Sequence, residues 1–342
     1  MWHSIAHNTL RPLPFVRYNR GMSSTLTGAP PRLSRLDRPV DPRPFRIMPR
    51  DLIILRQVAR FRFLTATQIA RLVPGSDQRI GRRIRLLFFH GFLDCPRVQR
   101  QQLAHVFEAG NFPLVYGLAR AGAQLLAQEL TWINPGLDWS TNNRRATAPF
   151  LAHTIETADV MIGFDWACGQ SDALRLIDHH EMLPLMPVAT RELRRRDNPF
   201  KLKPSVAIPS ERQPVTIAVV PDRLFSLVSA SQRSNYALEL DRGEMDIESR
   251  KVVGKSSIRR KFLGYWNAWN QDLHTDQWGF KAFRVLFVTP TEARLQNMIA
   301  ALGRVVPGGS NLFLFSTPER LADAGALGPA WITGKGELTA LT

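Results

Sequence analysis

The stretch QRIGRRIRLLFFHGFLD, residues 78–94, places four arginines directly before a run of leucine and phenylalanine. At 3.6 residues per turn, the apolar side chains fall on one stripe of a helix and the guanidinium groups on the opposite face. The stripe consists of Ile80, Ile84, Leu87 and Phe88, and the charged face of Arg79, Arg82, Arg83 and Arg85. Leu86 is the one apolar exception on the charged face. The segment therefore predicts an amphipathic helix that Ser76 caps and Gly91 ends.

Short helical and extended patterns surround this arginine helix. Helices are predicted over residues 49–61, 65–73 and 121–130, and extended segments over residues 92–102 and 112–122. Three compact helices followed by a hairpin form the winged helix-turn-helix arrangement. In that arrangement the third helix enters the DNA major groove and the wing contacts backbone phosphates. Residues 49–130 are therefore predicted to be a winged helix-turn-helix DNA-binding domain.

The positive charge of the chain is concentrated in this region and in the residues before it. The 342 residues carry a formal net charge of +16. Residues 1–48 hold eight Lys and Arg against two Asp and Glu, and residues 49–130 hold twelve against five, whereas the remaining residues hold 25 against 22. Guanidinium groups suit phosphate oxygens and base edges, so we expect double-stranded DNA as the partner. The expected DNA contacts are Arg79, Arg82, Arg83 and Arg85 on the helix and Arg97 and Arg100 on the wing. The alternatives are a solvated surface and a helix that docks on another protein.

Composition excludes several other classes of protein. Hydrophobic residues make up 44% of the chain, which suffices for packed cores. Two cysteines, Cys95 and Cys168, exclude a disulfide framework or a cysteine zinc cluster. No apolar run reaches the about 18–20 residues that span a bilayer, so no membrane partner is expected. Residues 1–48 are predicted to be a basic, disordered arm, with either Met1 or Met22 as the start.

The second half of the chain alternates helical and strand-like patterns after a polar linker over residues 131–149. Helices are predicted over residues 150–168, 257–269 and 291–302, and strands over residues 173–178, 215–227, 235–243, 283–289 and 311–317. The first of these helices carries an apolar stripe of Leu151, Ile155, Ala158, Ile162 and Trp166. Interleaved strands and helices indicate a mixed α/β sheet over residues 150–318, with residues 319–342 as a C-terminal tail. The predicted fold class is therefore multi-domain α/β.

Three carboxylates of this half are expected to converge. Strand alternation puts Glu239 and Asp241 on one face, and Asp222 precedes Glu239 by seventeen positions, a spacing that a hairpin can bridge. Like charges repel unless a cation or a proton joins them, so Asp222 and Glu239 are candidate ligands for Mg²⁺ or Mn²⁺. Such an ion can polarise a phosphodiester and activate water. The alternative is that Asp222 is a turn residue and the other two acids pair with arginines.

The order of these elements resembles the PD-(D/E)xK nuclease plan, in which a hairpin carries the dipeptide PD and then acid-x-Lys. The resemblance implies Asp222 as the first acid and Glu239 as the second. Asp241 stands where that plan has its lysine, and Lys261 on the next helix is available as a replacement. The candidate catalytic residues are therefore Asp222, Glu239, Asp241 and Lys261. The altered motif favours a nuclease-like sheet without cleavage activity.

Taken together, the two halves resemble the replication-relaxation family of plasmids and other mobile elements. The resemblance rests on PRDLIILRQVARFRFLTATQIARLV, RRIRLLFFHGFLD and VYGLARAGAQLL, and downstream on LAHTIETADV, PDRLF, ELDRG and KFLGY. It implies a winged-helix DNA-binding domain joined to a restriction-endonuclease-like region. The implied role is replication, relaxation or mobilisation of element DNA in the bacterial cytoplasm, in association with the nucleoid or a plasmid.

Three hypotheses of function follow from the sequence. The first is a DNA-binding protein that uses the arginine helix, and the second is a metal-dependent DNA endonuclease or nickase. The third is a non-enzymatic adaptor that docks on a relaxase or replication initiator and has no DNA affinity of its own. Winged-helix proteins often form homodimers on two-fold sites, although no coiled-coil heptads indicate one here. The adjacent His179 and His180 are expected to lie in a strand, with a surface role rather than a shared metal.

Overall fold

The first part of the fold consists of short helices and strands. The structure, a computed structural model, describes residues 36–99, 114–130, 133, 137–193, 197–249 and 256–341. The helices are α1 (Pro49–Phe61), α2 (Ala66–Leu72) and α3 (Asp77–Phe89). The strands are β1 (Phe63–Thr65), β2 (Leu93–Asp94) and β3 (Val115–Leu118), paired antiparallel in the order β1-β3-β2. The helices predicted over 49–61, 65–73 and the arginine segment are therefore present.

Local hydrogen bonds and backbone geometry set the ends of these helices. The Thr65 N–H donates to Gln68 Oε1 (2.9 Å), and the Gln68 N–H donates to Thr65 Oγ1 (3.1 Å), which forms the reciprocal cap of α2. After α3, Gly91 has a φ of +74°, a conformation that only glycine adopts without steric cost. The Thr65 cap and the position of Gly91 are those that the sequence pattern indicates, whereas Ser76 occupies the N-cap position of α3 without a capping hydrogen bond from its side chain.

The hairpin after α3 differs from the expected one. In the described part of the predicted segment 92–102, residues 92–99, only Leu93–Asp94 is extended. Pro96 has no N–H to continue the ladder, and residues 98–99 are helical. The Gln99 side chain closes the base of the hairpin instead: its Nε2 donates to the Val115 carbonyl (2.8 Å) and its Oε1 accepts from the Val115 N–H (2.9 Å). The connection over residues 100–113, with Arg100, lies outside the described residues.

Packed structure occupies much of the predicted linker. Helices α5 (Arg120–Leu126), α6 (Trp139–Arg144) and α7 (Ala148–Gly169) follow β3. In α6, Trp139 and Asn143 are buried, and Asn143 Nδ2 donates to the Leu118 carbonyl (2.9 Å). The Arg62 guanidinium lies over the Trp139 ring, 5.1 Å from its centroid. Because both side chains are buried and contact other elements, residues 139–144 are part of the packed structure and not a free linker.

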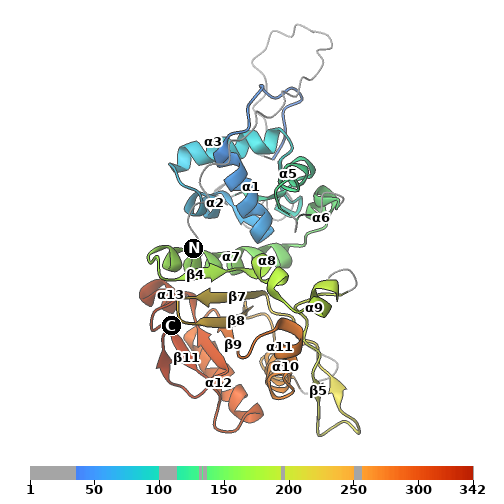
Figure 1. The fold of residues 1–342 in the computed structure, drawn as a ribbon, viewed down its shortest axis with the longest axis vertical. Helices are drawn as coiled ribbons and strands as arrows, with labels where there is room; N and C mark the ends of the chain where they lie inside the picture. The colour runs from blue at the N-terminus through green and yellow to red at the C-terminus, as the bar shows by residue number, and fades with distance from the viewer. Residues whose placement is uncertain are drawn as a thin grey trace. The chain divides into compact units, whose positions relative to one another are not determined.

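Helix α7 packs between the helical part and the large sheet. It contacts β1 and α2 on one side and β4 and β8 on the other. Figure 1 shows α7 between the N-terminal helices and the sheet. Buried side chains therefore surround much of the helix instead of forming a single stripe. The predicted stripe is confirmed at Leu151, Ala158 and Ile162, which are buried. It is wrong at Trp166, which is 66% exposed.

A mixed sheet forms the second part of the fold. Over the described residues, its order is β12-β11-β10-β9-β8-β7-β4. Its strands are β4 (Arg175–Ile177), β7 (Arg223–Val228), β8 (Arg233–Leu240), β9 (Arg284–Val288), β10 (Phe313–Ser316), β11 (Trp331–Thr333) and β12 (Leu338–Thr339). β8, β9 and β10 run parallel, and the other neighbours pair antiparallel. Parallel neighbours need crossover connections, which α10 (Ile258–Asn270) with α11 (Leu273–Trp278), and then α12 (Glu292–Val305), supply.

An insertion separates β4 from β7. It contains α8 (His179–Met182), the 3₁₀ helix η1 (Leu183–Leu185), α9 (Val188–Leu193) and the paired strands β5 (Ser205–Val206) and β6 (Val215–Thr216). The predicted strand 215–227 is thus split between β6 and β7, because Pro221 cannot donate to a ladder.

A glycine allows this insertion to pack on α10. A Cβ at Gly264 would lie 2.3 Å from Val219 Cγ1.

Both predicted end segments contain ordered structure. The predicted tail 319–342 holds most of α13 (Pro318–Ala324) and both β11 and β12, and Trp331 is fully buried with its Nε1 donating to the Ala326 carbonyl (2.9 Å). At the other end, Arg38 Nε donates to the Phe88 carbonyl (2.8 Å), so the predicted arm packs on α3 over its last residues. Residues 1–35 lie outside the described residues.

Two large hydrophobic clusters stabilise residues Arg38–Thr342, which form one unit. The first runs from Ile54 on α1 through Phe164 on α7 to Trp331 on β11. The second lies on the other face of the sheet, under α10 and α12. The first cluster therefore forms a core that the N-terminal helices, from α1 onward, share with the sheet. None of the helices in the described part of the chain combines the length and apolar character that a membrane span requires.

We expect Trp331→Ala to lower the free energy of unfolding by about 3–5 kcal/mol, because it leaves a large cavity in the shared core. Chemical denaturation followed by far-UV circular dichroism measures the change. Leu338→Ala, on the adjacent strand and 59% exposed, is the matched control and should change stability by less than about 0.5 kcal/mol. Equal effects of the two substitutions would contradict the placement of the C-terminal residues in the core.

Candidate nucleic-acid interface and carboxylate site

The apolar stripe of α3 is buried as predicted. Ile80, Ile84, Leu87 and Phe88 are each at most 4% exposed and pack in the first hydrophobic cluster. Leu86 is half-buried. Because the apolar stripe is buried, it fixes the orientation of α3 about its own axis. The arginines therefore lie on the parts of the helix surface that the stripe does not occupy.

The four arginines of α3 divide into two groups. Arg79, Arg82 and Arg85 are exposed, and none of them forms an ion pair within the described part of the chain. Arg83 is turned toward α1, where its Nε donates to Asp51 Oδ1 (2.8 Å). Asp51 is fully buried, so this pair is an internal contact of the fold.

Further contacts hold Arg83 in place. Its Nη2 donates to the Arg46 carbonyl (2.8 Å), and its guanidinium lies over the Phe45 ring, 5.1 Å from the centroid. The hydrogen bonds that Arg83 donates to the Asp51 carboxylate raise the pKa of Arg83 above its usual value. The structure therefore gives Arg83 partners within the protein, whereas its three neighbours point outward. Of the two predicted wing residues, Arg97 is exposed and Arg100 is outside the described residues.

The hairpin of β7 and β8 brings Asp222 next to Glu239. The Asp222 N–H donates to the Leu238 carbonyl (2.9 Å), and Asp222 Oδ2 accepts from the Leu240 N–H (2.8 Å). The predicted alternation is also present, since Leu238 and Leu240 join the first hydrophobic cluster and Ala237 joins the second. The side chain of Glu239 consequently points toward α10.

Two residues of α10 bind the Glu239 carboxylate, which is 1% exposed. Lys261 Nζ donates to Oε2 and the Tyr265 hydroxyl donates to Oε1, both at 2.5 Å. Burial raises the pKa of Glu239 to about 6. Burial acts to lower the pKa of Lys261, but the charges of Glu239 and Asp222 outweigh it and raise that pKa. The lysine available on the next helix therefore reaches the second acid.

A histidine that was not among the predicted site residues completes this group. His153 Nε2 on α7 lies 2.9 Å from Asp222 Oδ1. Burial acts to raise the pKa of Asp222, but the hydrogen bond from His153 and the charge of Lys261 lower it overall. The same hydrogen bond raises the pKa of His153. We name His153, Asp222, Glu239, Lys261 and Tyr265 the carboxylate cluster.

Asp241 lies outside the carboxylate cluster. Its carboxylate accepts from Arg294 Nε (2.5 Å) and Nη2 (2.9 Å) on α12 and from Thr289 Oγ1 (2.7 Å). These bonds outweigh burial and lower the pKa of Asp241. Asp241 continues the predicted alternation, because α12 covers the same face of the sheet as α10. Its carboxylate is held by Arg294 and Thr289, however, and no described hydrogen bond joins it to Asp222 or Glu239.

The cluster does not form a ready metal site. Both oxygens of Glu239 and both of Asp222 already accept hydrogen bonds from protein groups. Across the described ranges, no three His, Cys, Asp or Glu side chains are grouped so that they could hold a metal ion. The predicted ligands Asp222 and Glu239 are thus neighbours, but Lys261 and His153 occupy the positions next to them where a cation would bind.

His179 and His180 also differ from expectation. They begin α8 instead of lying in a strand, and both are half-buried. Burial lowers the pKa of His180 to about 4 and that of His179 well below its usual range. Both rings are therefore neutral at physiological pH, and a surface role does not describe them.

The fold and these sites define a mixed α/β protein that carries a three-helix unit with an exposed arginine face and, in its sheet, a paired carboxylate cluster. The model of the replication-relaxation family matches residues 55–281, well over half of the chain, so the chain belongs to that family. Membership associates it with the replication and relaxation of plasmid or other mobile-element DNA. No curated protein and no solved structure matches the chain.

We predict that His153 titrates above the ordinary histidine value and that Asp222→Asn returns its pKa toward about 6.5, because the acceptor charge is lost. Nuclear magnetic resonance titration of the histidine ring measures both values. Since folding raises the pKa of His153, its contribution to stability is present below about pH 6.5 and is lost as pH rises through the folded-state value, as long as Asp222 stays ionised. An unchanged titration of His153 in Asp222→Asn would disprove the pairing.

Proposed function

We propose that the chain binds duplex DNA through a winged helix-turn-helix unit in which α3 is the recognition helix. The observation that carries the proposal is the division of the α3 arginines. Arg79, Arg82 and Arg85 face solvent without a described acidic partner, while Arg83 anchors the helix to α1 through Asp51. A helix held rigidly on one side and lined with guanidinium groups on the other suits a polyanion.

A comparison with arginines elsewhere supports this interpretation. Several exposed or half-buried arginines on other elements bind nearby carboxylates: Arg56 with Glu129, Arg71 with Asp159, Arg175 with Glu181, Arg304 with Glu248 and Arg320 with Glu292. Such surface pairs neutralise one another and leave little net field. The face of α3 has no such compensation within the described residues, and it also belongs to the segment with the largest excess of positive charge.

The order of elements supports the same assignment. α1, β1, α2, α3, β2 and β3 follow one another along the chain, and β1 joins the β2–β3 hairpin as a third antiparallel strand. That order is the one expected of a winged helix, with the wing between β2 and β3. Arg97 follows β2 and is exposed, so it adds a cation at the base of the proposed wing.

We expect the triple substitution of Arg79, Arg82 and Arg85 by alanine to weaken duplex binding by at least about 100-fold, because three phosphate or base contacts are lost. Fluorescence anisotropy with a labelled random duplex, repeated over a series of salt concentrations, measures the affinity. The slope of log affinity against log salt should fall by about 0.9 for each phosphate contact removed.

The control for this experiment is a triple alanine variant of Arg175, Arg304 and Arg320, which changes the net charge equally but removes only paired surface arginines. It should retain most of the affinity. Equal losses in the two triple variants would show that net charge alone, and not the α3 face, carries binding. If the wild type has no affinity even at low salt, the adaptor hypothesis replaces DNA binding.

DNA cleavage by the carboxylate cluster is the second candidate function. The observation that favours it is the contact of Lys261 with Glu239 beside Asp222, which supplies from α10 the lysine that the acid-x-Lys motif lacks. The protein donors on both carboxylates oppose it, because a divalent ion would have to displace them. Four further statements stay hypotheses. They are that the sheet is restriction-endonuclease-like, that nicking depends on a metal ion, that a relaxase or replication initiator is a partner, and that the protein binds DNA as a homodimer.

Incubation of supercoiled plasmid with Mg²⁺ or Mn²⁺ tests cleavage. On this hypothesis the wild type converts the plasmid to nicked or linear forms, and Asp222→Ala and Lys261→Met abolish the conversion because each removes a member of the cluster. Glu292→Gln, an exposed acid paired with Arg320 on α12, is the matched control and should stay active. A wild type that is inert across salts and substrates excludes the enzyme.

A further inference from the structure

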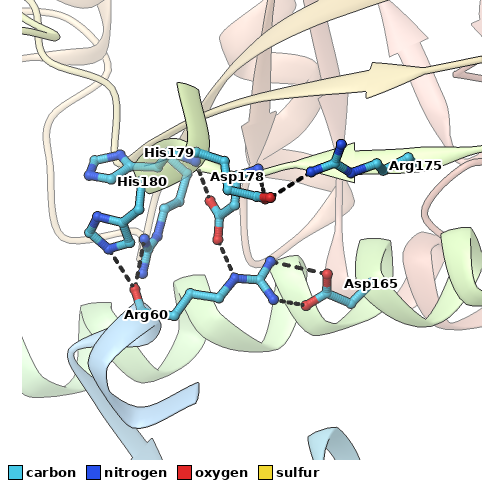
Figure 2. A network of polar contacts seen from close by, with 8 residues as sticks. Arg60, Asp165, Arg175, Asp178, His179 and His180 are labelled. Carbon is cyan, nitrogen blue, oxygen red and sulfur yellow. Dashed lines mark hydrogen bonds and ion pairs between the residues drawn. The ribbon is translucent and has the colours of Figure 1, made fainter. Parts of the chain in front are cut away.

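Helix α1 is anchored at both ends by guanidinium–carboxylate contacts. At its first turn, Asp51 binds Arg83 of α3. At its last turn, Arg60 binds Asp165 of α7 through Nη1 and Nη2, at 2.7 and 3.0 Å, and Asp178 through Nε at 2.5 Å. Figure 2 shows the Arg60 guanidinium between these two carboxylates.

The backbone at the end of α1 is held as well. The Arg60 carbonyl accepts a hydrogen bond from Arg223 Nη1 (3.2 Å), and His180 Nε2 lies 3.2 Å from the same oxygen, as Figure 2 shows for His180. The guanidinium groups of Arg60 and Arg223 lie over the Phe61 ring, 4.7 and 5.4 Å from its centroid. We name Arg60, Asp165, Asp178, His180 and Arg223 the α1 anchor.

The next residue along the chain connects the α1 anchor to the carboxylate cluster. Arg223 is the first residue of β7 and directly follows Asp222. Arg223 is 8% exposed and donates to the Arg60 carbonyl of α1, whereas the adjacent Asp222 binds His153 of α7. A shift of the Arg60 carbonyl therefore acts on the peptide that positions the Asp222 carboxylate.

The α1 anchor resists separation because its charges are buried and balanced. Two arginines face two aspartates, and Asp178 is 3% exposed. Removing one member would leave an unpaired charge in a low-dielectric environment, so the anchor moves as a unit with α1. A regular helix of 13 residues is about 20 Å long and does not bend at this length without a proline or a bulge.

We propose that α1 transmits displacements of α3 to Asp222, so that occupancy of the arginine face alters the geometry of the carboxylate cluster. The path is the Asp51–Arg83 pair, the body of α1, the Arg60 carbonyl and the Arg223 guanidinium, and the backbone of Arg223 adjoins Asp222. This coupling goes beyond DNA binding itself. The coupling requires that the arginine face of α3 and the carboxylate cluster both contact helix α1 or its anchors, and that α1 moves as a rigid unit because charged contacts hold both of its ends.

A mutant cycle read by hydrogen exchange tests the coupling without DNA. Asp51→Asn loosens the α3 end. Arg60→Lys removes the forked donor to Asp165 and Asp178, the contact that fixes the position of the Arg60 carbonyl opposite Arg223 at the other end. In the wild-type background, Asp51→Asn should raise exchange about fivefold both in α3 and in the peptide that contains residues 221–228. In the Arg60→Lys background it should still raise exchange in α3 but no longer at residues 221–228.

Arg56→Lys is the matched control, because Arg56 lies on the same helix in an exposed pair with Glu129 and should leave the transmitted effect intact. If Arg60→Lys does not fold, Asp165→Asn, which keeps the Asp178 contact, takes its place. The coupling is rejected if Asp51→Asn changes α3 alone in the wild type, or changes residues 221–228 equally in both backgrounds.

A second arm adds saturating duplex to the wild type and to Arg60→Lys. DNA should change exchange at residues 221–228 only in the wild type, while both variants bind the duplex. Absence of DNA binding would count against the proposed function alone, because the mutant cycle still decides the coupling. Binding by both with an identical response at residues 221–228 would overturn the transmission through Arg60.

Discussion

Helix α7 is covered on two sides, and this double burial determines how the rest of the chain is arranged. One side packs against β1 and α2, and the other against β4 and β8. The hydrophobic cluster around it extends from Ile54 on α1 to Leu341 near the C-terminus. Two regions that the sequence presents as separate domains thereby share one core, and the polar groups between them must be satisfied inside the protein.

Charged side chains join neighbouring elements in three places, and the contacts of Arg60 are the ones among these that cross between the two regions. Arg83 and Asp51 join α3 to α1, Arg60 joins α1 to α7 and α8, and Lys261 joins α10 to Glu239. Each of these pairs is fixed by several hydrogen bonds, so each element has one preferred position relative to the next. The same arrangement leaves Arg79, Arg82 and Arg85 without internal partners, and this contrast distinguishes a structural arginine from one available to a ligand.

The carboxylate cluster shows how neighbouring side chains change the chemistry of two adjacent acids. Asp222 and Glu239 lie where the hairpin register places them, but a histidine, a lysine and a tyrosine occupy their oxygens. Asp241 is drawn away by Arg294. The two carboxylates are therefore ion-paired and hydrogen-bonded instead of free to bind a metal ion. For this reason we place DNA cleavage second to DNA binding as a proposed function.

Sequence alone determined the features that depend on neighbours a few residues apart. These are the stripe of Ile80 and Ile84, the cap by Thr65, the end of α3 at Gly91 and the alternation in β8, because helix and strand periodicity act locally. Only the tertiary structure decided that Arg83 binds Asp51, that His153 binds Asp222 and that residues 319–342 complete the sheet. The two ion-pair contacts join residues roughly 30 and 70 positions apart in the sequence, and the strands of residues 319–342 pair with other elements. A short-range sequence pattern does not specify which distant residue a buried charge will pair with.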